Sequence, residues 1–198
     1  MNYLAHVYLS GDDDNLKIGN FIADSVKGKK FLNFPEPIQK GIVLHRAIDH
    51  YTDTHPIVTK SVTRLFSRYS HYSRVIVDIL YDHFLAKNWN HYSQQHLEEY
   101  TEEFYDLLRE NKTVLPKSVQ RFMPYMFRDN WLLSYASIDG ITKILYQMNH
   151  RTKGKSQMNL AVEELEIYYT EFQEEFTEFF ADLISFSSEK IKELNQTQ

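Results

Sequence analysis

Histidine and aspartate side chains are unusually dense in the stretch GIVLHRAIDHYTDTHP, residues 41–56. His45 and Asp49 stand four residues apart and continue the apolar stripe that Ile38 and Ile42 begin, so they share one face of the expected helix. Burying an imidazole and a carboxylate on that face without partners would cost several kcal/mol. The pair therefore requires either a metal ion or a direct His–Asp hydrogen bond, and the spacing leaves both open.

A second expected helix, residues 73–89, repeats this spacing with Asp78 and Asp82. These two carboxylates lie within ~40° of each other on the helical wheel. Because like charges on one face repel, a metal ion or an arginine is expected between them. His83 points ~100° away from Asp82, so it reaches the same site only if this helix is largely buried.

Asp24, in the sequence FIADSVKG, and His6, near the N-terminus, extend the candidate ligand set. The set contains carboxylates and imidazoles but no sulfur, which suits Mn, Mg or Fe better than a structural zinc site. A purely structural interpretation also exists, because a His–Asp pair at i, i+4 commonly stabilises a helix surface. Two such pairs on facing helices favour the metal site.

Arg46, His50 and Asp53 share a different face of the helix at residues 41–56. Arg46 can clamp a phosphate with two parallel hydrogen bonds. An ion pair between Arg46 and Asp53 is equally compatible with the spacing. The sequence therefore leaves a phosphate-binding and a structural role open for this face.

The composition is that of a globular protein. The 198 residues, 42% of them hydrophobic, suffice for one sizeable core, and no linker divides them, so a single domain spanning residues 1–198 is expected. A net charge of -5 argues against non-specific nucleic-acid binding. Zero cysteines exclude disulfides and Cys-rich zinc sites. Without a signal peptide or a run of ~18 apolar residues, we expect a cytoplasmic protein with no membrane span.

Helical periodicity dominates the chain, since apolar residues recur every three or four residues rather than every second residue. Only 6 Gly and 5 Pro interrupt this pattern. The fold class expected is therefore an all-α, single-domain helical bundle. Asp12, Asp13 and Asp14 are expected to cap a helix that Gly28 ends. The segment between Pro116 and Pro124, with the aromatic residues that follow it, is expected to form a broken helix. Further helices are expected at about 35–56, 56–69, 73–89, 93–110, 137–154 and 160–187, with N-caps at Ser73 and Ser93 and an aromatic stripe opposite an acidic face on the last.

Several segments carry a resemblance that extends from end to end: NYLAHVYLS, GNFIADSVKG, GIVLHRAIDHYTDTHP, DILYDHFLAKNW, and NWLLSYASIDGITKIL followed by Arg151. They resemble the acyl carrier protein phosphodiesterase family, also called acyl carrier protein hydrolase. The resemblance implies an all-helical fold distantly related to the HD-domain phosphohydrolases. It also implies a divalent metal, typically manganese with Mg or Fe as alternatives, and hydrolysis of holo acyl carrier protein to apo protein and 4'-phosphopantetheine.

The resemblance further implies roles for individual residues. HD-domain enzymes have a consecutive His–Asp pair, whereas this chain has the reversed order Asp82-His83, so ligand roles cannot be copied from them directly. The metal ligands expected are Asp24, His45, Asp49, Asp78 and Asp82, the catalytic residues His83, His45 and Arg46, and the supporting residues His6 and Asp53.

An acidic carrier protein requires a basic docking surface on a chain with net negative charge. Two short clusters qualify, although each is also compatible with an ordinary solvated loop. The substrate-binding residues expected are Lys27, Lys29, Lys30 and Arg46 on one side, and Arg151 with Lys153 and Lys155 on the other. Two other functions stay open: a phosphohydrolase acting on a nucleotide or another small phosphoester, and a non-catalytic helical binding module.

Overall fold

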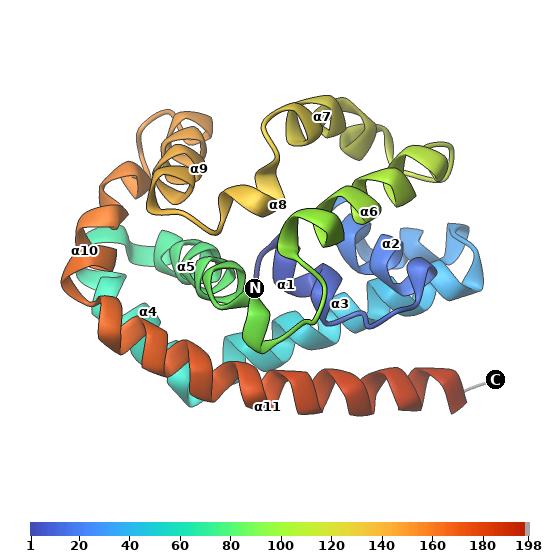
Figure 1. Ribbon diagram of the computed structural model, residues 1–198, viewed down its shortest axis with the longest axis horizontal. Helices are drawn as coiled ribbons and strands as arrows, with labels where there is room; N and C mark the ends of the chain where they lie inside the picture. The colour runs from blue at the N-terminus through green and yellow to red at the C-terminus, as the bar shows by residue number, and fades with distance from the viewer. Residues whose placement is uncertain (197–198) are drawn as a thin grey trace.

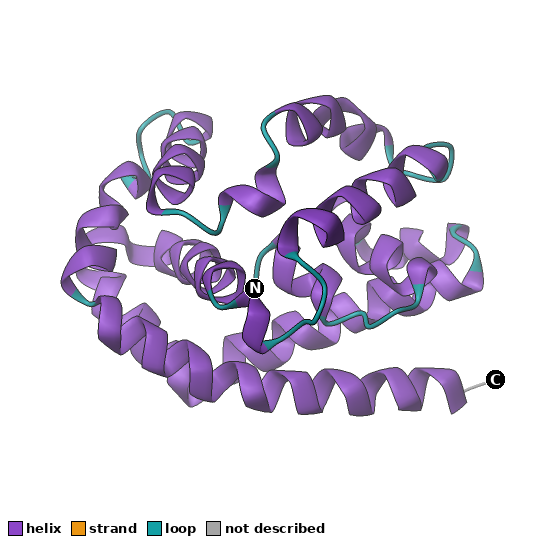
Figure 2. Ribbon diagram, viewed as in Figure 1, coloured by secondary structure: helices purple, strands orange, loops and turns teal. Residues whose placement is uncertain are grey.

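The computed structural model describes residues 1–196, and every regular element in that range is helical (Figures 1 and 2). This confirms the predicted all-α fold class. The α-helices are α1 (Tyr3–Tyr8), α2 (Asp14–Ile22), α3 (Glu36–Thr54), α4 (Pro56–Tyr69), α5 (Ser73–Lys87), α6 (Leu97–Glu110), α7 (Lys117–Arg128), α8 (Trp131–Ser134), α9 (Ile138–Arg151), α10 (Ala161–Ile167) and α11 (Tyr169–Gln196). The 3-10 turns are η1 (Ala23–Ser25), η2 (Gly28–Asn33), η3 (Ser70–Tyr72), η4 (Trp89–His91) and η5 (Met158–Leu160).

Helix α5 lies in the middle of the molecule, in contact with α1, α4, α9 and α11 (Figure 1). Residues 79–86 are buried without interruption, including Asp82 and His83, which point in different directions. A helix that is apolar on all sides must be surrounded by other elements. Helix α5 is therefore largely buried, which is the condition stated above for His83 to point inward. Asp82 and His83 must each find a partner inside the core.

Helix α11 packs an aromatic stripe against α3, α4 and α5. The predicted stripe is confirmed: Phe172, Phe176, Phe179, Phe180 and Leu183 are all 0% exposed. The predicted single helix over residues 160–187 is wrong, because the chain bends at Tyr168 and divides into α10 and α11. The predicted acidic face also has an exception in Glu175, which is buried.

Glu175 is held inside the core by partners from α4. Its two carboxylate oxygens each accept a hydrogen bond of 2.7 Å from the Arg64 guanidinium, and the Ser61 hydroxyl donates to the same carboxylate. A buried charge needs such pairing to offset its desolvation. The acidic residue thus ties α11 to α4.

Several helix ends differ from the sequence prediction. Helix α2 ends at Ile22 rather than near Gly28, and α6 begins at Leu97 because the Ser93 hydroxyl accepts a hydrogen bond from the Gln95 N–H (3.1 Å) in a local turn. Ser73 is the first residue of α5 and makes no capping bond. Helix α7 continues through Pro124, α9 ends at Arg151, and the short helices α1 and α8 were not predicted. Asp13 caps α2 as expected.

Helices α2 and α3 cross with their backbones in contact at Gly19 and Gly41. A Cβ atom on Gly19 would lie 2.2 Å from the Ile38 carbonyl oxygen, and one on Gly41 would lie 2.5 Å from the Leu16 carbonyl oxygen. Both distances are far below van der Waals contact, so only glycine fits at either position. This crossing sets the register between the two helices on which the candidate site is built.

We expect Gly41→Ala to destabilise the protein by about 3 kcal/mol, because the new methyl group would push α2 away from α3. In a helix without such a close neighbour, Gly→Ala stabilises the protein by up to about 1 kcal/mol. The sign of the change in the free energy of unfolding therefore shows whether the two backbones are in contact. Urea unfolding followed by circular dichroism measures the difference. Ser67→Ala, at an exposed position on α4, is the matched control and should change stability by less than about 0.5 kcal/mol.

Candidate metal centre

Side chains from three elements meet where α1, α3 and η1 come together. The Nε2 atom of His45 lies 3.0 Å from Asp49 Oδ2 and 3.3 Å from Asp24 Oδ1. The Nε2 atom of His6 lies 3.2 Å from Asp49 Oδ1. Ligand atoms of His6, His45 and Asp49 all lie within 4.8 Å of one another. These three residues can hold a metal ion, and Asp24 stands beside them.

The two imidazoles stack with ring centroids 4.0 Å apart and an interplanar angle of 19°. Their Nδ1 atoms both meet the side-chain oxygen of Asn20, at 2.7 Å from His6 and 3.1 Å from His45. Neither Nε2 atom has a hydrogen bond of acceptable geometry, although both are buried. Two bare imidazole nitrogens aimed at shared carboxylates fit the donor set of a divalent cation.

The carboxylates and imidazoles shift one another's pKa. Burial works to lower the pKa of His45, but the contacts and charges of Asp24 and Asp49 outweigh it and raise this pKa to about 9. For His6, burial together with the neighbouring His45 charge lowers the pKa to about 4. The contact with His45 holds the pKa of Asp24 below its usual value. At neutral pH the metal-free site thus holds one imidazolium between two ionised carboxylates and has a net negative charge, and a bound cation would take the place of the proton on His45 Nε2.

The site is buried on its nitrogen side and open on its oxygen side. The side chains of His6 and His45 are 4% and 7% exposed, against 43% for Asp49 and 72% for Asp24. A ligand from solvent therefore approaches past the carboxylates, and the imidazoles form the floor.

Asp82 lies at the N-terminus of α1 instead of in this cluster. Its carboxylate accepts hydrogen bonds from the backbone N–H groups of Asn2 (3.1 Å), Leu4 (2.8 Å) and Ala5 (3.4 Å). Burial raises the pKa of Asp82 to about 7, although these N–H groups and the Met1 ammonium oppose the shift. Asp82 thus satisfies the unpaired N–H groups of a helix start, a role for which aspartate is well suited.

Asp78 lies one turn before Asp82 and accepts a hydrogen bond of 2.9 Å from the Met1 ammonium. The positive group expected beside the two aspartates is therefore this ammonium. In residues 1–196 the cluster of metal-ligand type contains His6, His45 and Asp49, and it includes neither Asp78 nor Asp82.

The ring nitrogens of His83 are engaged away from the cluster. Its Nδ1 lies 2.7 Å from the Tyr135 carbonyl oxygen, and its Nε2 lies 3.1 Å from the Tyr169 hydroxyl. Burial lowers the pKa of His83, so the ring is neutral. His83 therefore links α5 to α11 and to the loop before α9.

Arg46 donates hydrogen bonds to the carbonyl oxygens of Val26 (3.1 Å) and Gly28 (2.8 Å), and its guanidinium lies over the Phe31 ring at 5.0 Å from the centroid. Asp53, the alternative partner, pairs instead with Arg74 at 3.0 Å. Arg46 therefore anchors the turn that joins η1 to η2, the segment that carries the lysine cluster.

The predicted substrate-binding residues Lys27, Lys29 and Lys30 are exposed on this segment, next to Asp24 in the chain. Arg151 is exposed at the end of α9. Burial and the Asp24 charge raise the pKa of Tyr3, while Arg151 opposes the shift, so both charged residues act on the same phenol. Asp24 and Arg151 therefore both lie within electrostatic reach of the Tyr3 hydroxyl.

Sequence reasoning did not identify Asn20, and it treated His6 as a supporting residue. The sequence contained one signal for Asn20, which is a lone amide between the apolar Ile18, Phe21 and Ile22. A polar side chain in that setting must be hydrogen-bonded. The sequence contained no signal for His6, since α1 is too short for a periodic pattern.

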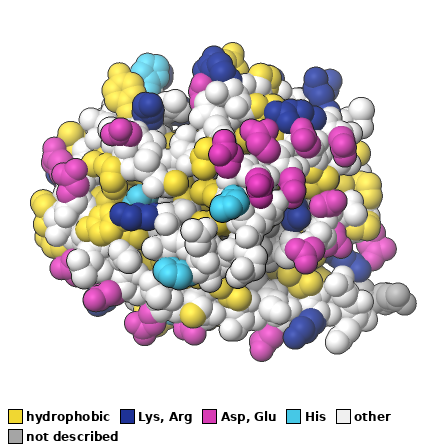
Figure 3. Space-filling model, viewed as in Figure 1, with side chains coloured by type: hydrophobic (Ala, Val, Ile, Leu, Met, Phe, Trp, Pro, Cys, Tyr) yellow, Lys and Arg dark blue, Asp and Glu magenta, His cyan; other side chains and the backbone are white. Residues whose placement is uncertain are grey.

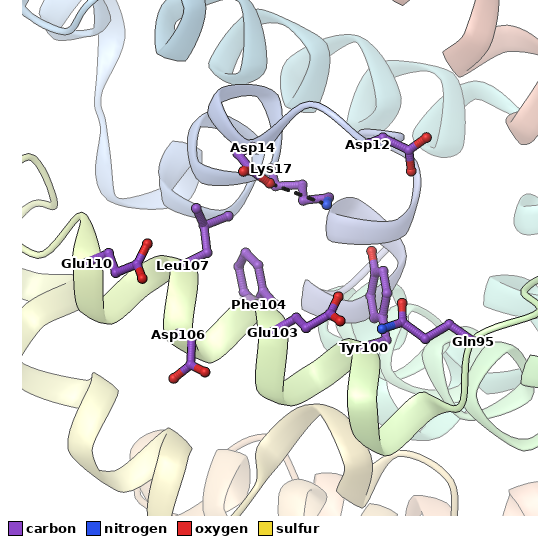
Figure 4. Close-up of a pocket in the computed structure, with 10 residues that line it drawn as sticks. All are labelled: Asp12, Asp14, Lys17, Gln95, Tyr100, Glu103, Phe104, Asp106, Leu107 and Glu110. Carbon is purple, nitrogen blue, oxygen red and sulfur yellow. Dashed lines mark ion pairs between the residues drawn. The ribbon is translucent and has the colours of Figure 1, made fainter.

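A separate cavity of ≈ 380 Å³ lies between the start of α2 and α6 (Figure 4). Its polar lining is mostly acidic, and Lys17 pairs with Asp14 at 3.5 Å inside it. Acidic side chains also gather over α6 on the face seen in Figure 3. A negatively charged ligand is repelled here, so this cavity does not serve an anion site. The carboxylates that line it are Asp12, Asp14, Glu103, Asp106 and Glu110.

The fold and the centre define an all-helical protein with a His–His–Asp site able to hold a metal ion. Residues 1–183 match the family model described as acyl carrier protein phosphodiesterase, and the chain belongs to that family. The chain is 30% identical over 195 residues to an acyl carrier protein phosphodiesterase of Escherichia coli O6:H1, covering 96% of this chain and 99% of the relative. It is 29% identical over 181 residues to one of Photorhabdus laumondii, covering 91% of each.

No solved structure matches the chain significantly, so the distant relation to HD-domain enzymes stays a prediction. Within residues 1–196, no helix combines the length and the apolar character that crossing a bilayer requires.

We expect the purified protein to bind a divalent ion and to lose at least about tenfold in affinity on changing His6, His45 or Asp49 to alanine, because each change removes a ligand atom. Isothermal titration with Mn²⁺ measures this. His83→Ala is the control, since its nitrogens bind Tyr135 and Tyr169. Equal losses in all four variants would show that the centre is not where the ion binds.

Proposed function

We propose that this protein is a metal-dependent phosphodiesterase that hydrolyses holo acyl carrier protein to the apo protein and 4'-phosphopantetheine. The observation that carries the proposal is the centre of His6, His45 and Asp49, which opens to solvent past Asp24 in a member of this family. The curated relatives named acyl carrier protein phosphodiesterase support the choice of substrate. A cytoplasmic location, where such a substrate is made, belongs to the same proposal.

His6, His45 and Asp49 would hold the ion, and Asp24 would supply a further oxygen or receive the proton of the attacking water. Manganese is the metal that we favour, with Mg or Fe as alternatives, because the donors are nitrogen and oxygen only. Such an ion lowers the pKa of a bound water and offsets charge on the phosphodiester.

Asp78 and Asp82 take a supporting role in this proposal. Their hydrogen bonds to the first residues of the chain hold α1, and α1 carries His6. His45 does not donate a proton to the leaving group in this proposal, because its Nδ1 faces Asn20 and its Nε2 faces the carboxylates.

The basic residues around the opening would bind the anionic substrate. Arg151, like Asp24, lies within electrostatic reach of the Tyr3 hydroxyl and, within residues 1–196, its one side-chain hydrogen bond is to the sulfur of Met148, so no carboxylate pairs with it. Lys27, Lys29 and Lys30 extend this positive charge outward, and Arg46 fixes the segment that bears them. An acidic carrier protein would be attracted to this side and repelled from the acidic surface over α6.

We expect Asp49→Ala to lower kcat/KM for release of 4'-phosphopantetheine by about 10³-fold or more, because it removes the carboxylate shared by both imidazoles. Mass spectrometry of the carrier protein before and after reaction measures the release. Asp53→Ala, which breaks an exposed ion pair with Arg74, should leave the rate within about twofold.

The same assay run beside a panel of nucleotides and small phosphoesters separates the alternatives. Faster turnover of a small phosphoester than of the carrier protein would replace the proposed substrate. Metal binding without hydrolysis of any substrate would contradict catalysis and favour a binding module.

We expect the double variant Lys29→Glu and Lys30→Glu to raise KM for holo acyl carrier protein about tenfold at low salt and to leave kcat nearly unchanged, because it weakens docking and not chemistry. The salt dependence of KM should fall with it. The double variant Lys112→Glu and Lys117→Glu, at exposed positions between the acidic α6 and the start of α7, is the charge-matched control. An unaltered KM in the double variant would remove this segment from the docking surface.

A further inference from the structure

Asn20 is fully buried at the point where α2 meets α1 and α3. Its side-chain oxygen lies 2.7 Å from Nδ1 of His6 and 3.1 Å from Nδ1 of His45. One carbonyl oxygen, which has two lone pairs, thus meets both imidazoles of the centre. No other side chain in residues 1–196 hydrogen-bonds to both rings.

The amide group of Asn20 has its own fixed partners. Its Nδ2 donates to the His6 carbonyl oxygen (2.8 Å) and to the Ser10 hydroxyl (3.0 Å), and Ser10 in turn donates to the same carbonyl oxygen (2.9 Å). A flipped amide would face the His6 carbonyl with an oxygen, which is repulsive. The oxygen of Asn20 therefore faces the rings, and an acceptor there requires a proton on Nδ1 of both.

We propose that Asn20 is a positioning residue that holds His6 and His45 together in the tautomer with the proton on Nδ1. In the neutral rings this leaves the lone pair of each Nε2 on the side of Asp49, whose two oxygens each face one ring at 3.2 and 3.0 Å, so that a cation between them would meet both nitrogens. Asn20 and Asp49 close a polar ring around the stacked imidazoles. The tautomers of the two rings exist without a metal. The inference rests on the proposed metal centre only for the expected effect of Asn20 on metal affinity.

The location of Asn20 follows from the helix crossing. Asn20 succeeds Gly19, and His45 stands one helical turn after Gly41, the two glycines whose backbones touch. Hydrogen bonds of this kind orient a ligating histidine and raise its basicity, and their loss typically costs 10–100-fold in metal affinity. Here a single residue exerts that effect on two ligands at once.

The test compares variants that separate the two ends of the Asn20 side chain. Asn20→Asp keeps an oxygen for the two rings but loses the Nδ2 donor, Asn20→Leu loses both, and Ser10→Ala removes an outer partner only. The tautomers are measured in metal-free protein by ¹⁵N–¹H NMR of the histidine side chains well above pH 9, where the neutral form of His45 predominates. Affinity for Mn²⁺ is measured by the electron paramagnetic resonance signal of the free ion.

We expect wild type and Ser10→Ala to keep both protons on Nδ1 and to bind Mn²⁺ within about threefold of each other. Asn20→Asp should also keep both protons on Nδ1, and its added negative charge should leave the affinity for Mn²⁺ equal or higher. Asn20→Leu should release at least one ring to the other tautomer and weaken binding about 10–100-fold. Unchanged tautomers and affinity in Asn20→Leu would overturn the proposal.

If Asn20→Leu does not fold, Asn20→Asp decides the question, because a loss of affinity and of the Nδ1 tautomer there would show that the oxygen is not what positions the rings. Since these measurements use no substrate, their outcome is independent of whether the protein cleaves a carrier protein. Absence of hydrolysis with both tautomers retained would contradict the proposed function and leave Asn20 in its positioning role.

Discussion

Polar groups inside an all-helical core must be paired, and this requirement organises much of the molecule. An unpaired polar group in the interior costs far more than a paired one gains. Glu175 is therefore paired with Arg64 and Ser61, and Asp82 accepts hydrogen bonds from the first N–H groups of α1. The Nε2 atoms of His6 and His45 are among the buried polar atoms that lack a hydrogen bond. These two nitrogens lie together beside the Asp49 carboxylate, where one ligand can satisfy both.

The short helix α1 depends on this pairing more than any other element. Six residues cannot form a stable helix by themselves, since nucleation is unfavourable and few hydrogen bonds follow it. Asp82 of the central helix supplies the missing acceptors, and the Asn20 amide binds the carbonyl of His6. The stability of the core and the geometry of the centre are therefore linked, because the same contacts that hold α1 also place His6.

Charge is unevenly distributed over the chain. The carboxylates of α2 and α6 line an acidic cavity, whereas Lys29 and Lys30 are exposed on the segment that follows Asp24. The net charge of -5 does not reveal this distribution, since it sums over all charged residues. The proposed docking of an acidic carrier protein depends on such a local excess of positive charge, because a local field can attract a partner that the net charge repels.

The sequence by itself determined the helical fold class, the aromatic stripe of α11, the family, and the shared helix face of His45 and Asp49. Each of these follows from spacing within one helix or from motifs, because the 3.6-residue period sets which residues share a face. Tertiary structure decided which faces meet. Asp78 and Asp82 have the same spacing as His45 and Asp49, yet they turn to α1, while His6 and Asn20 join the centre from other helices. No local pattern encodes that choice, since it depends on how closely two backbones approach at Gly19 and Gly41 and on which apolar surfaces are covered.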